Sequence, residues 1–333
     1  MKSDFVYEHS AVDREDAALA GDGRFDGKVI DGHCHLASTR YVPDAVFSGL
    51  ARNSLDRMEA AGRGVPFDRL KQLIRSQYQD HNGDRLIKEM GAANIESAVL
   101  LVPDFTYEME CELPYDVMVD EHVSVLQRHP GRFYLFYGVD PRYGEAGLAR
   151  FKRLVDRHGL DGIKLYPPCG YSPSDPELDA YYDICATIRA PVLSHTGPTF
   201  PTLRFSYAHP ALIAGAAHRF PTVNFILAHG AVNHSHDALY QAAYRPNVFL
   251  DASGYLGIAD VEAFNRQFRA ICAHGIAHKI IFGTDWPIFR GQGDLKQAVE
   301  RFVAPDGPLR DQPNAAAHKI LRGTIAKLIR RSP

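Results

Sequence analysis

The chain has 333 residues, of which 45% are hydrophobic and 23% charged, and its formal net charge is -3 at pH 7. This is the composition of an ordinary globular protein with a large core, and the charge balance argues against a nucleic-acid partner or a membrane-binding surface. Five scattered cysteines without a CxxC pair argue against a disulfide framework and for a reducing compartment.

The chain opens with a polar N-terminal extension, residues 1–27, that has no signal-peptide pattern. No apolar run approaches the length of a membrane span, so we expect a cytoplasmic protein. From there on, short apolar runs alternate with amphipathic helical segments. The predicted strands are 28–30, 97–102, 133–139, 162–166, 191–194, 223–228, 248–251 and 279–282, and the clearest helices are 116–128, 144–157, 175–188, 210–219 and 259–273.

Strands that alternate with helices predict a parallel sheet in an α/β protein. Eight strands without a break between domains favour a closed (β/α)8 TIM barrel over residues 28–333. The competing fold is a doubly wound open sheet, which should carry a glycine-rich phosphate loop after its first strand. Nothing like GxGxxG follows residues 28–30, so we predict the barrel.

The spacing is broken once, by a longer segment at residues 37–94 between the first two strands. Its stretches 56–61, 68–80 and 84–90 have charged faces with Leu and Ile at helical intervals, which predicts a helical insertion. Because it follows the first strand, it should lie over the barrel mouth. It could act as a lid or as the arm of a homodimer, or it could simply pack at the rim.

The first strand ends in a pair of histidines, His33 and His35. Alternate side chains of a strand share a face, so both imidazoles point the same way and form half of a divalent-metal site. The spacing alone is weak evidence, because the chain has 16 histidines and His234 and His236 repeat it.

Other predicted strands also end in polar side chains: Lys164, His195, His229 and Asp285. Each has an ordinary structural explanation, such as a hydrogen-bonded histidine, a Lys–Asp pair or a turn-capping Asp. However, the C-terminal strand ends of a barrel converge on one mouth. Together with His33 and His35, these groups would bury several charges there without reason unless they hold a metal.

The order of these residues resembles the amidohydrolase superfamily. The segments GIKLYP (162–167), LAHG (227–230), PNVFLD (246–251) and FGTDWP (282–287) resemble its amidohydrolase-related branch, which includes decarboxylases similar to aminocarboxymuconate-semialdehyde decarboxylase and hydrolases of lactones and C–N bonds. The resemblance implies that His33, His35, His195 and Asp285 bind a divalent metal, with zinc preferred and manganese second. His229 would then be the acid/base or substrate-polarising histidine.

Lys164 has two interpretations under this resemblance. In binuclear members of the superfamily the strand-four lysine is carboxylated and bridges two ions, with the fifth- and sixth-strand histidines on the second ion. In the branch that this chain most resembles, one metal is usual, and Lys164 would be a cation suited to a substrate carboxylate. We favour one ion.

Further residues near the predicted mouth could bind a small-molecule substrate. Arg142, Arg204 and Lys164 suit an acid, while Tyr166 and Trp286 would form apolar walls. Arg142 could instead pair with Asp140, two residues before it.

These residues lead to three hypotheses about function. The first is a hydrolase in which metal-activated water attacks an amide, lactone or ester carbonyl while Asp285 transfers the proton. The second is a non-oxidative decarboxylase or hydratase with the same ligands, acting on an aromatic or unsaturated acid. The third is a barrel that only binds. Because Lys164 is present, we favour hydrolysis.

Overall fold

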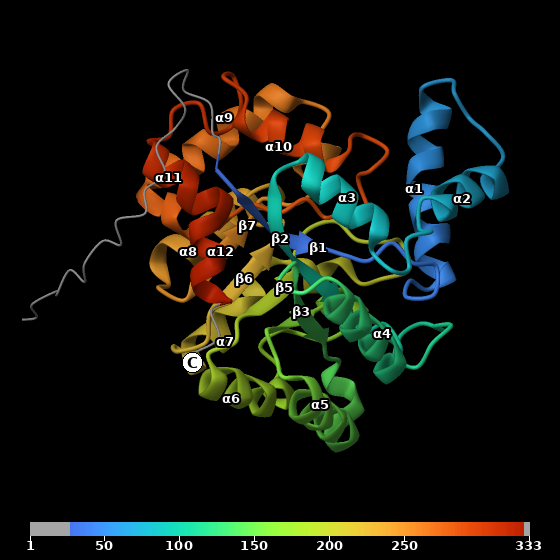
Figure 1. The fold of residues 1–333 in the computed structure, drawn as a ribbon, viewed down its shortest axis with the longest axis vertical. Helices are drawn as coiled ribbons and strands as arrows, with labels where there is room; N and C mark the ends of the chain where they lie inside the picture. Colours follow the sequence, from blue (N-terminus) through green and yellow to red (C-terminus); the bar gives the residue numbers. More distant parts are fainter. Residues whose placement is uncertain (1–26, 330–333) are drawn as a thin grey trace, which may run out of the picture.

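The computed structural model describes residues 27–329, and its centre is a sheet of eight parallel strands that follow one another in chain order (Figure 1). Their bounds are β1 (Val29–Cys34), β2 (Ile95–Val102), β3 (Phe133–Gly138), β4 (Gly162–Leu165), β5 (Val192–His195), β6 (Phe225–Ala228), β7 (Val248–Asp251) and β8 (Ile280–Ile281). Backbone hydrogen bonds then join β1 to the segment after β8: Gly32 N–H donates to Phe282 O at 2.9 Å, and His35 N–H to Trp286 O at 2.8 Å. The predicted barrel is confirmed.

Helices surround the strands, as Figure 1 shows. They are α3 (Asp84–Ala92), α4 (Tyr115–Arg128), α5 (Gly144–His158), α6 (Asp179–Ile188), α7 (Ala214–Arg219), α8 (Ser235–Tyr244), α9 (Val261–Ile271), α10 (Leu295–Val303), α11 (Asn314–His318) and α12 (Thr324–Leu328). From β2 to β8 one α-helix, α4 to α9 in turn, lies between each strand and the next, which is the connection that parallel strands require.

The core has two layers because each strand turns alternate side chains to its two faces. The inner cluster fills the barrel and includes Ile30, Leu101, Phe136, Leu193, Ile226 and Ile281, together with Ile325 and Leu328 of α12. The outer cluster lies between the strands and the helices. Gly32 has a specific role in this packing, since a Cβ there would lie 2.4 Å from a side-chain carbon of Ile281 and would push β1 away from β8.

Two helices stand apart from this ring, α1 (Asp44–Ala60) and α2 (Phe67–Ser76), both in the segment between β1 and β2. They pack against each other beside the barrel (Figure 1). Asp44 of α1 pairs with Lys71 and Arg75 of α2, at 2.5 and 2.8 Å. A bridge between Ser38 and Gln79 joins the chain before α1 to the chain after α2.

The N-terminal extension predicted at residues 1–27 lies outside the described residues except for Gly27. Within residues 27–329, none of the helices combines the length and the apolar character that crossing a bilayer would require.

Candidate active site

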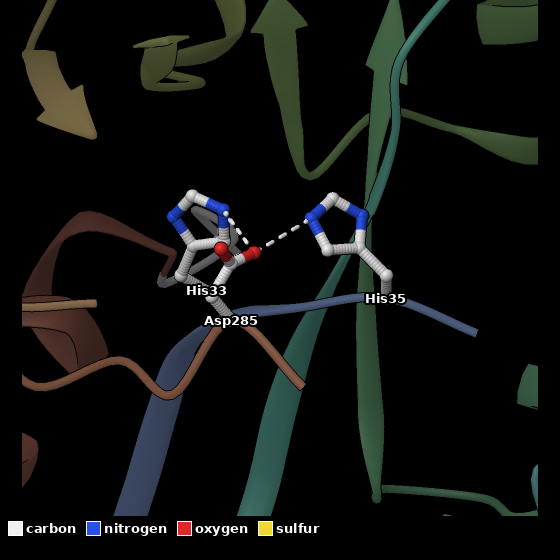
Figure 2. Close-up of side chains that lie close together, drawn as sticks. All are labelled: His33, His35 and Asp285. Carbon is white, nitrogen blue, oxygen red and sulfur yellow. Dashed lines mark ion pairs between the residues drawn. The ribbon is translucent and has the colours of Figure 1, made fainter. Parts of the chain in front are cut away.

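Three side chains from two separate segments meet where the strands end (Figure 2). Oδ1 of Asp285 lies 3.3 Å from Nε2 of His33 and 3.2 Å from Nε2 of His35. The candidate ligand atoms of all three residues lie within 4.8 Å of one another. The structure therefore brings together three of the four predicted metal ligands.

Local backbone features aim these side chains. The register of β1 against β2 shifts between Asp31 and Cys34, and Cys34 packs into the outer core, so His33 and His35 share the opposite face as predicted. Asp285 has φ of 59°, a left-handed conformation that is costly for a non-glycine residue. Its N–H donates to His33 O at 2.8 Å, which holds it beside the histidine pair.

The other nitrogen of each histidine is already engaged. Nδ1 of His33 lies 2.8 Å from the Asp251 carboxylate, and Nδ1 of His35 lies 2.9 Å from Leu101 O. Both partners only accept hydrogen bonds, so both Nδ1 atoms carry hydrogens. In the neutral rings, both Nε2 lone pairs then face Asp285 Oδ1. Three acceptors that converge in this way repel one another unless a cation lies among them.

The spacing of these atoms fits a metal ion. Two ligands bound to one tetrahedral ion at about 2.0 Å lie about 3.3 Å apart, and Asp285 Oδ1 lies 3.2 and 3.3 Å from the two Nε2 atoms. Imidazole nitrogens with one carboxylate oxygen suit zinc or manganese. A carboxylate and a backbone carbonyl behind the histidines are also the usual support of metal-bound imidazole.

The charges of the cluster are consistent with this fit. Burial alone would raise the pKa of Asp285, but the histidines, His33 foremost, hold it well below its usual range when their rings are protonated and donate to it. Burial lowers the pKa of His35, which keeps that ring neutral. Burial and Lys164 act to lower the pKa of His33, whereas Asp251 and Asp285 raise it overall. Without a metal, a proton on His33 would offset part of the negative charge.

His195, the fourth predicted ligand, lines the same cavity but is not part of the three-residue cluster. Its Nε2 lies 3.2 Å from Pro198 O, and its ring stacks on Tyr166 with centroids 4.4 Å apart. Burial lowers its pKa well below the usual range, so it is neutral. Because Pro198 O only accepts, the lone pair of His195 in this arrangement is on Nδ1.

Lys164 and His229 complete the predicted set, and both are buried in the cavity wall. Burial lowers the pKa of Lys164 to about 8, against the opposing effect of Asp285 and Asp251. Burial likewise lowers the pKa of His229 to about 4. Nδ1 of His229 lies 3.1 Å from Ser253 O and so carries the hydrogen, which leaves its lone pair on Nε2.

Asp251 and Ser253 were missing from the sequence-predicted site, although they hold it together. Asp251 is fully buried and accepts hydrogen bonds from the rings or backbone of three residues: His33 Nδ1 (2.8 Å), His229 N (2.8 Å) and Ser253 N (3.0 Å). The Ser253 hydroxyl contacts both His33 Nδ1 and His229 Nδ1. The available signal was that Asp251 ends β7 on the same face as Phe249, which packs against the inner core.

The cluster opens into a cavity of about 710 Å³. Lys164 and Tyr166 line it, as predicted, and α1 supplies part of its wall. Arg142, Arg204 and Trp286 are not among its lining residues. Arg142 pairs with Asp140 (2.6 Å) and Glu108 (2.8 Å), Arg204 pairs with Glu108 (2.8 Å), and the Trp286 indole donates to Glu89 (3.1 Å). Each of these three residues thus has a protein partner outside the cavity lining, and its contact with substrate stays a prediction.

The sequence profile of the amidohydrolase family matches residues 30–331. The chain belongs to the amidohydrolase family. Among curated proteins, L-fucono-1,5-lactonase from Burkholderia ambifaria is 29% identical over 131 residues, which are 33% of this chain and 45% of the lactonase. The match thus spans less than half of that relative.

Several solved structures share the fold at low identity. An uncharacterised TIM-barrel protein from Bordetella bronchiseptica is 20% identical, with a TM-score of 0.63 over 91% of this chain and 98% of that one. A 5-carboxyvanillate decarboxylase from Novosphingobium aromaticivorans, solved with manganese, is 16% identical, with a TM-score of 0.62 over 91% and 96%. A 2,6-dihydroxybenzoate decarboxylase from Rhizobium is 18% identical, with a TM-score of 0.61 over 90% and 98%.

Proposed function

We propose that this protein is a metal-dependent hydrolase that opens a lactone or a related ester or amide of a small substrate. The observation that carries the proposal is the Asp285 carboxylate oxygen, which lies 3.3 and 3.2 Å from Nε2 of His33 and His35, two imidazoles whose Nδ1 atoms already have partners. A divalent ion held there supplies a Lewis acid, which makes water more acidic and polarises a carbonyl group. The sequence similarity to a lactonase supports hydrolysis as the reaction.

The surrounding residues have complementary tasks in this reaction. Asp285 accepts a proton from the attacking water and returns it to the leaving oxygen or nitrogen. The neutral His229 offers Nε2 as an acceptor that orients the water. Lys164, buried near Asp285, places positive charge beside the oxygen on which negative charge develops, or binds a substrate carboxylate. His195 stays in this proposal as a ligand that reaches the ion after its ring reorients.

We also propose a single ion, with zinc preferred over manganese. The other buried group of candidate ligands near the cavity consists of His33, His229 and Asp251. Its atoms are already joined by N–H donors and by the Ser253 hydroxyl, so it offers no converging lone pairs. Metal content per chain, measured with and without bicarbonate, tests this proposal. Two ions together with a bicarbonate requirement would instead indicate a carboxylated Lys164.

Decarboxylation of an aromatic acid is the second candidate. It is favoured by the aromatic side chains on the cavity wall, among them Phe105, Tyr166, Phe200 and Phe289, and by the fold shared with two aromatic-acid decarboxylases. The zinc- or manganese-loaded enzyme should be assayed with lactones, esters and amides for acid release, and with carboxylated phenols for CO₂. Acid release supports the hydrolase, whereas CO₂ release alone would replace it with the decarboxylase.

A further inference from the structure

The lining of the cavity differs in polarity from one segment to another. α1 contributes the charged side chains of Arg52, Asp56 and Arg57. The segments after β7 and β8 contribute, besides Asp285, only glycines and apolar residues: Gly254, Gly257, Ile258, Pro287, Ile288 and Phe289. We call Ile258, Ile288 and Phe289 the apolar corner of the cavity. All three side chains are partly buried and pack against the outer core.

The ring of Phe289 is seated against two glycines of one turn. A Cβ on Gly257 would lie 2.3 Å from Cε1 of Phe289 and 3.2 Å from Cζ, and a Cβ on Gly254 would lie 3.5 Å from Cε2 and 3.8 Å from Cζ. A hydrogen bond from Gly257 N–H to Gly254 O, at 3.0 Å, closes the turn. The tip of the ring thus occupies the space that two missing side chains leave.

The two glycines have different reasons to be glycine. Gly254 has φ of 87°, a conformation that favours glycine whatever surrounds it. Gly257 is not among the residues with positive φ, so its backbone would accept another residue. The three atoms nearest to a Cβ on Gly257 all belong to Phe289. Gly257 therefore sets how far the Phe289 ring lies back from the cavity.

The apolar corner lies beside the groups assigned to the reaction. A Cβ on Gly254 would lie 3.4 Å from Nδ1 of His229, so His229 and Phe289 approach the same glycine. Ile288 N–H donates to Asp285 O at 2.9 Å, which ties the other side of the corner to the candidate metal ligands. A substrate that reacts at Asp285 and His229 therefore has its neighbouring atoms within reach of the corner.

The side chains of the corner offer contact area and no hydrogen bonds. A hydrocarbon group gains free energy when it leaves water for such a surface, whereas a polar group would lose its water partners. We propose that Ile258, Ile288 and Phe289 form a subsite for a short alkyl substituent of the substrate, and that the Phe289 ring, seated on Gly257, limits the length of that substituent.

This inference rests on the proposed hydrolase function and narrows its substrate to a lactone, ester or amide with a short alkyl group near the reacting carbonyl. The charged residues of α1 belong to another part of the lining and take no part in this subsite. Specificity for the alkyl group then depends on the segments that follow β7 and β8.

Straight-chain hydroxamic acids test the subsite without requiring turnover, because their head group chelates a metal ion and their chain can be lengthened. Titration calorimetry on the zinc-loaded enzyme should show affinity rising by about 3- to 4-fold for each added methylene, beginning with acetohydroxamic acid. The rise should stop where the chain meets Phe289. In Phe289→Ala it should continue to longer acids. Phe289→Leu keeps more of the packing and should show a smaller shift in the same direction.

Gly257→Ala should have the opposite effect. The added methyl group takes the place of Phe289 Cε1, and the ring tip, which is free to turn on its side chain, moves towards the cavity. The rise in affinity should then stop at a shorter acid. The double variant Gly257→Ala/Phe289→Ala should match Phe289→Ala, because no ring is left to displace.

Gly91→Ala is the matched control for the added methyl group. Gly91 lies in α3 without positive φ, and a Cβ there would contact nothing beyond its own helix. Its chain-length profile should equal that of the wild type. The same profile in the wild type, Phe289→Ala and Gly257→Ala would overturn the subsite, and so would affinity that does not depend on chain length in the wild type.

The proposed function is judged separately, by hydrolysis of δ-valerolactone and its δ-alkyl homologues by the wild type. Hydrolysis of these lactones, with hydroxamate profiles that the variants leave unchanged, would keep the hydrolase and remove the subsite. Opposite shifts in Phe289→Ala and Gly257→Ala without any hydrolysis would keep the subsite and remove the hydrolase.

Discussion

The chain contains two histidine pairs with the same spacing, and the structure places them in opposite surroundings. His33 and His35 end a buried strand, whereas His234 and His236 lie at the start of α8, where the side chain of His236 is 80% exposed. Each pair contributes to a group of candidate metal ligands: the first with Asp285, and the second, through His234, with His209 and Asp237.

The two groups differ in the direction of their lone pairs. In the exposed group, His209 Nδ1 accepts a hydrogen bond from Ala211 N–H at 3.2 Å, so its Nε2 carries the hydrogen and faces Asp237 at 3.3 Å. That arrangement is satisfied without an ion. In the buried group, both Nδ1 atoms donate and both Nε2 lone pairs face a carboxylate. The spacing of two histidines therefore does not by itself indicate a metal site. The hydrogen-bond partner of one ring nitrogen must also leave the lone pair on the other nitrogen, where it can face the ion.

The largest difference in activity and metal content between the two groups should appear when Asp285 and Asp237 are each replaced by asparagine. Asp285→Asn removes a proposed ligand and the proposed proton carrier, so we expect kcat/KM to fall by at least about 100- to 10,000-fold and the bound metal to be lost. Steady-state kinetics and metal analysis by mass spectrometry measure both. Asp237→Asn is the matched variant in the exposed group and should change neither. An Asp285→Asn enzyme with normal turnover would remove Asp285 from the mechanism.

The buried charge of Lys164, which lies beside the candidate metal ligands, should also affect the free energy of unfolding. In the metal-free protein, Lys164→Met removes a buried cation whose pKa falls from 10.5 to about 8, a difference that corresponds to at most about 3 kcal/mol. Below pH 8 both the folded and the unfolded wild type hold the proton, so the folded state bears the full cost and the variant should be more stable.

Between about pH 8 and 10.5 the folded wild type releases the proton while the unfolded chain keeps it, so the free energy of unfolding of the wild type rises with pH. The advantage of Lys164→Met should shrink over this interval. Urea unfolding with a chelator present, at several pH values, measures it. Lys296→Met, on an exposed face of α10, is the control and should show no such trend. A constant difference between wild type and Lys164→Met would contradict the assignment of the pKa.

A smaller effect is expected from the residue that supports the cluster without belonging to it. Asp251→Asn turns an amide N–H or a weaker acceptor towards His33 and His229, while Asp285 and His35 keep their places. We expect zinc affinity and kcat/KM to fall by about 10- to 100-fold. Competition with a chromophoric chelator measures the affinity. Unchanged affinity would mean that the orientation of His33 does not depend on Asp251.

Much of the barrel could be predicted because its signals are local. Lys164 illustrates this: Ile163 and Leu165 on either side of it pack into the outer core, so alternation alone turned the lysine inward. The same reasoning placed His33 and His35 on one face. Convergence of distant strand ends then followed from the barrel, and it brought Asp285 to the histidine pair.

Other parts of the site depend on partners that are distant in sequence. Arg142 and Arg204 have the charge to bind an acid, but Glu108 lies between them and binds both. The indole N–H of Trp286 donates to Glu89 on α3, and no residue near Trp286 in the sequence predicts this partner. Asp251 was visible as a strand end, yet its task depends on Ser253 and two histidines from other strands. Such networks follow from packing and not from spacing.

The smallest change is expected in the exposed group. His209→Ala removes the hydrogen bond to Ala211 N–H and the contact with Asp237, both at the surface, so stability should fall by less than about 1 kcal/mol. Zinc content and kcat/KM should stay at wild-type values, because this group presents no converging lone pairs. Thermal unfolding and metal analysis check the two statements. If the variant instead lost one bound ion per chain, the exposed histidines would be a metal site, and the direction of lone pairs would no longer distinguish the two groups.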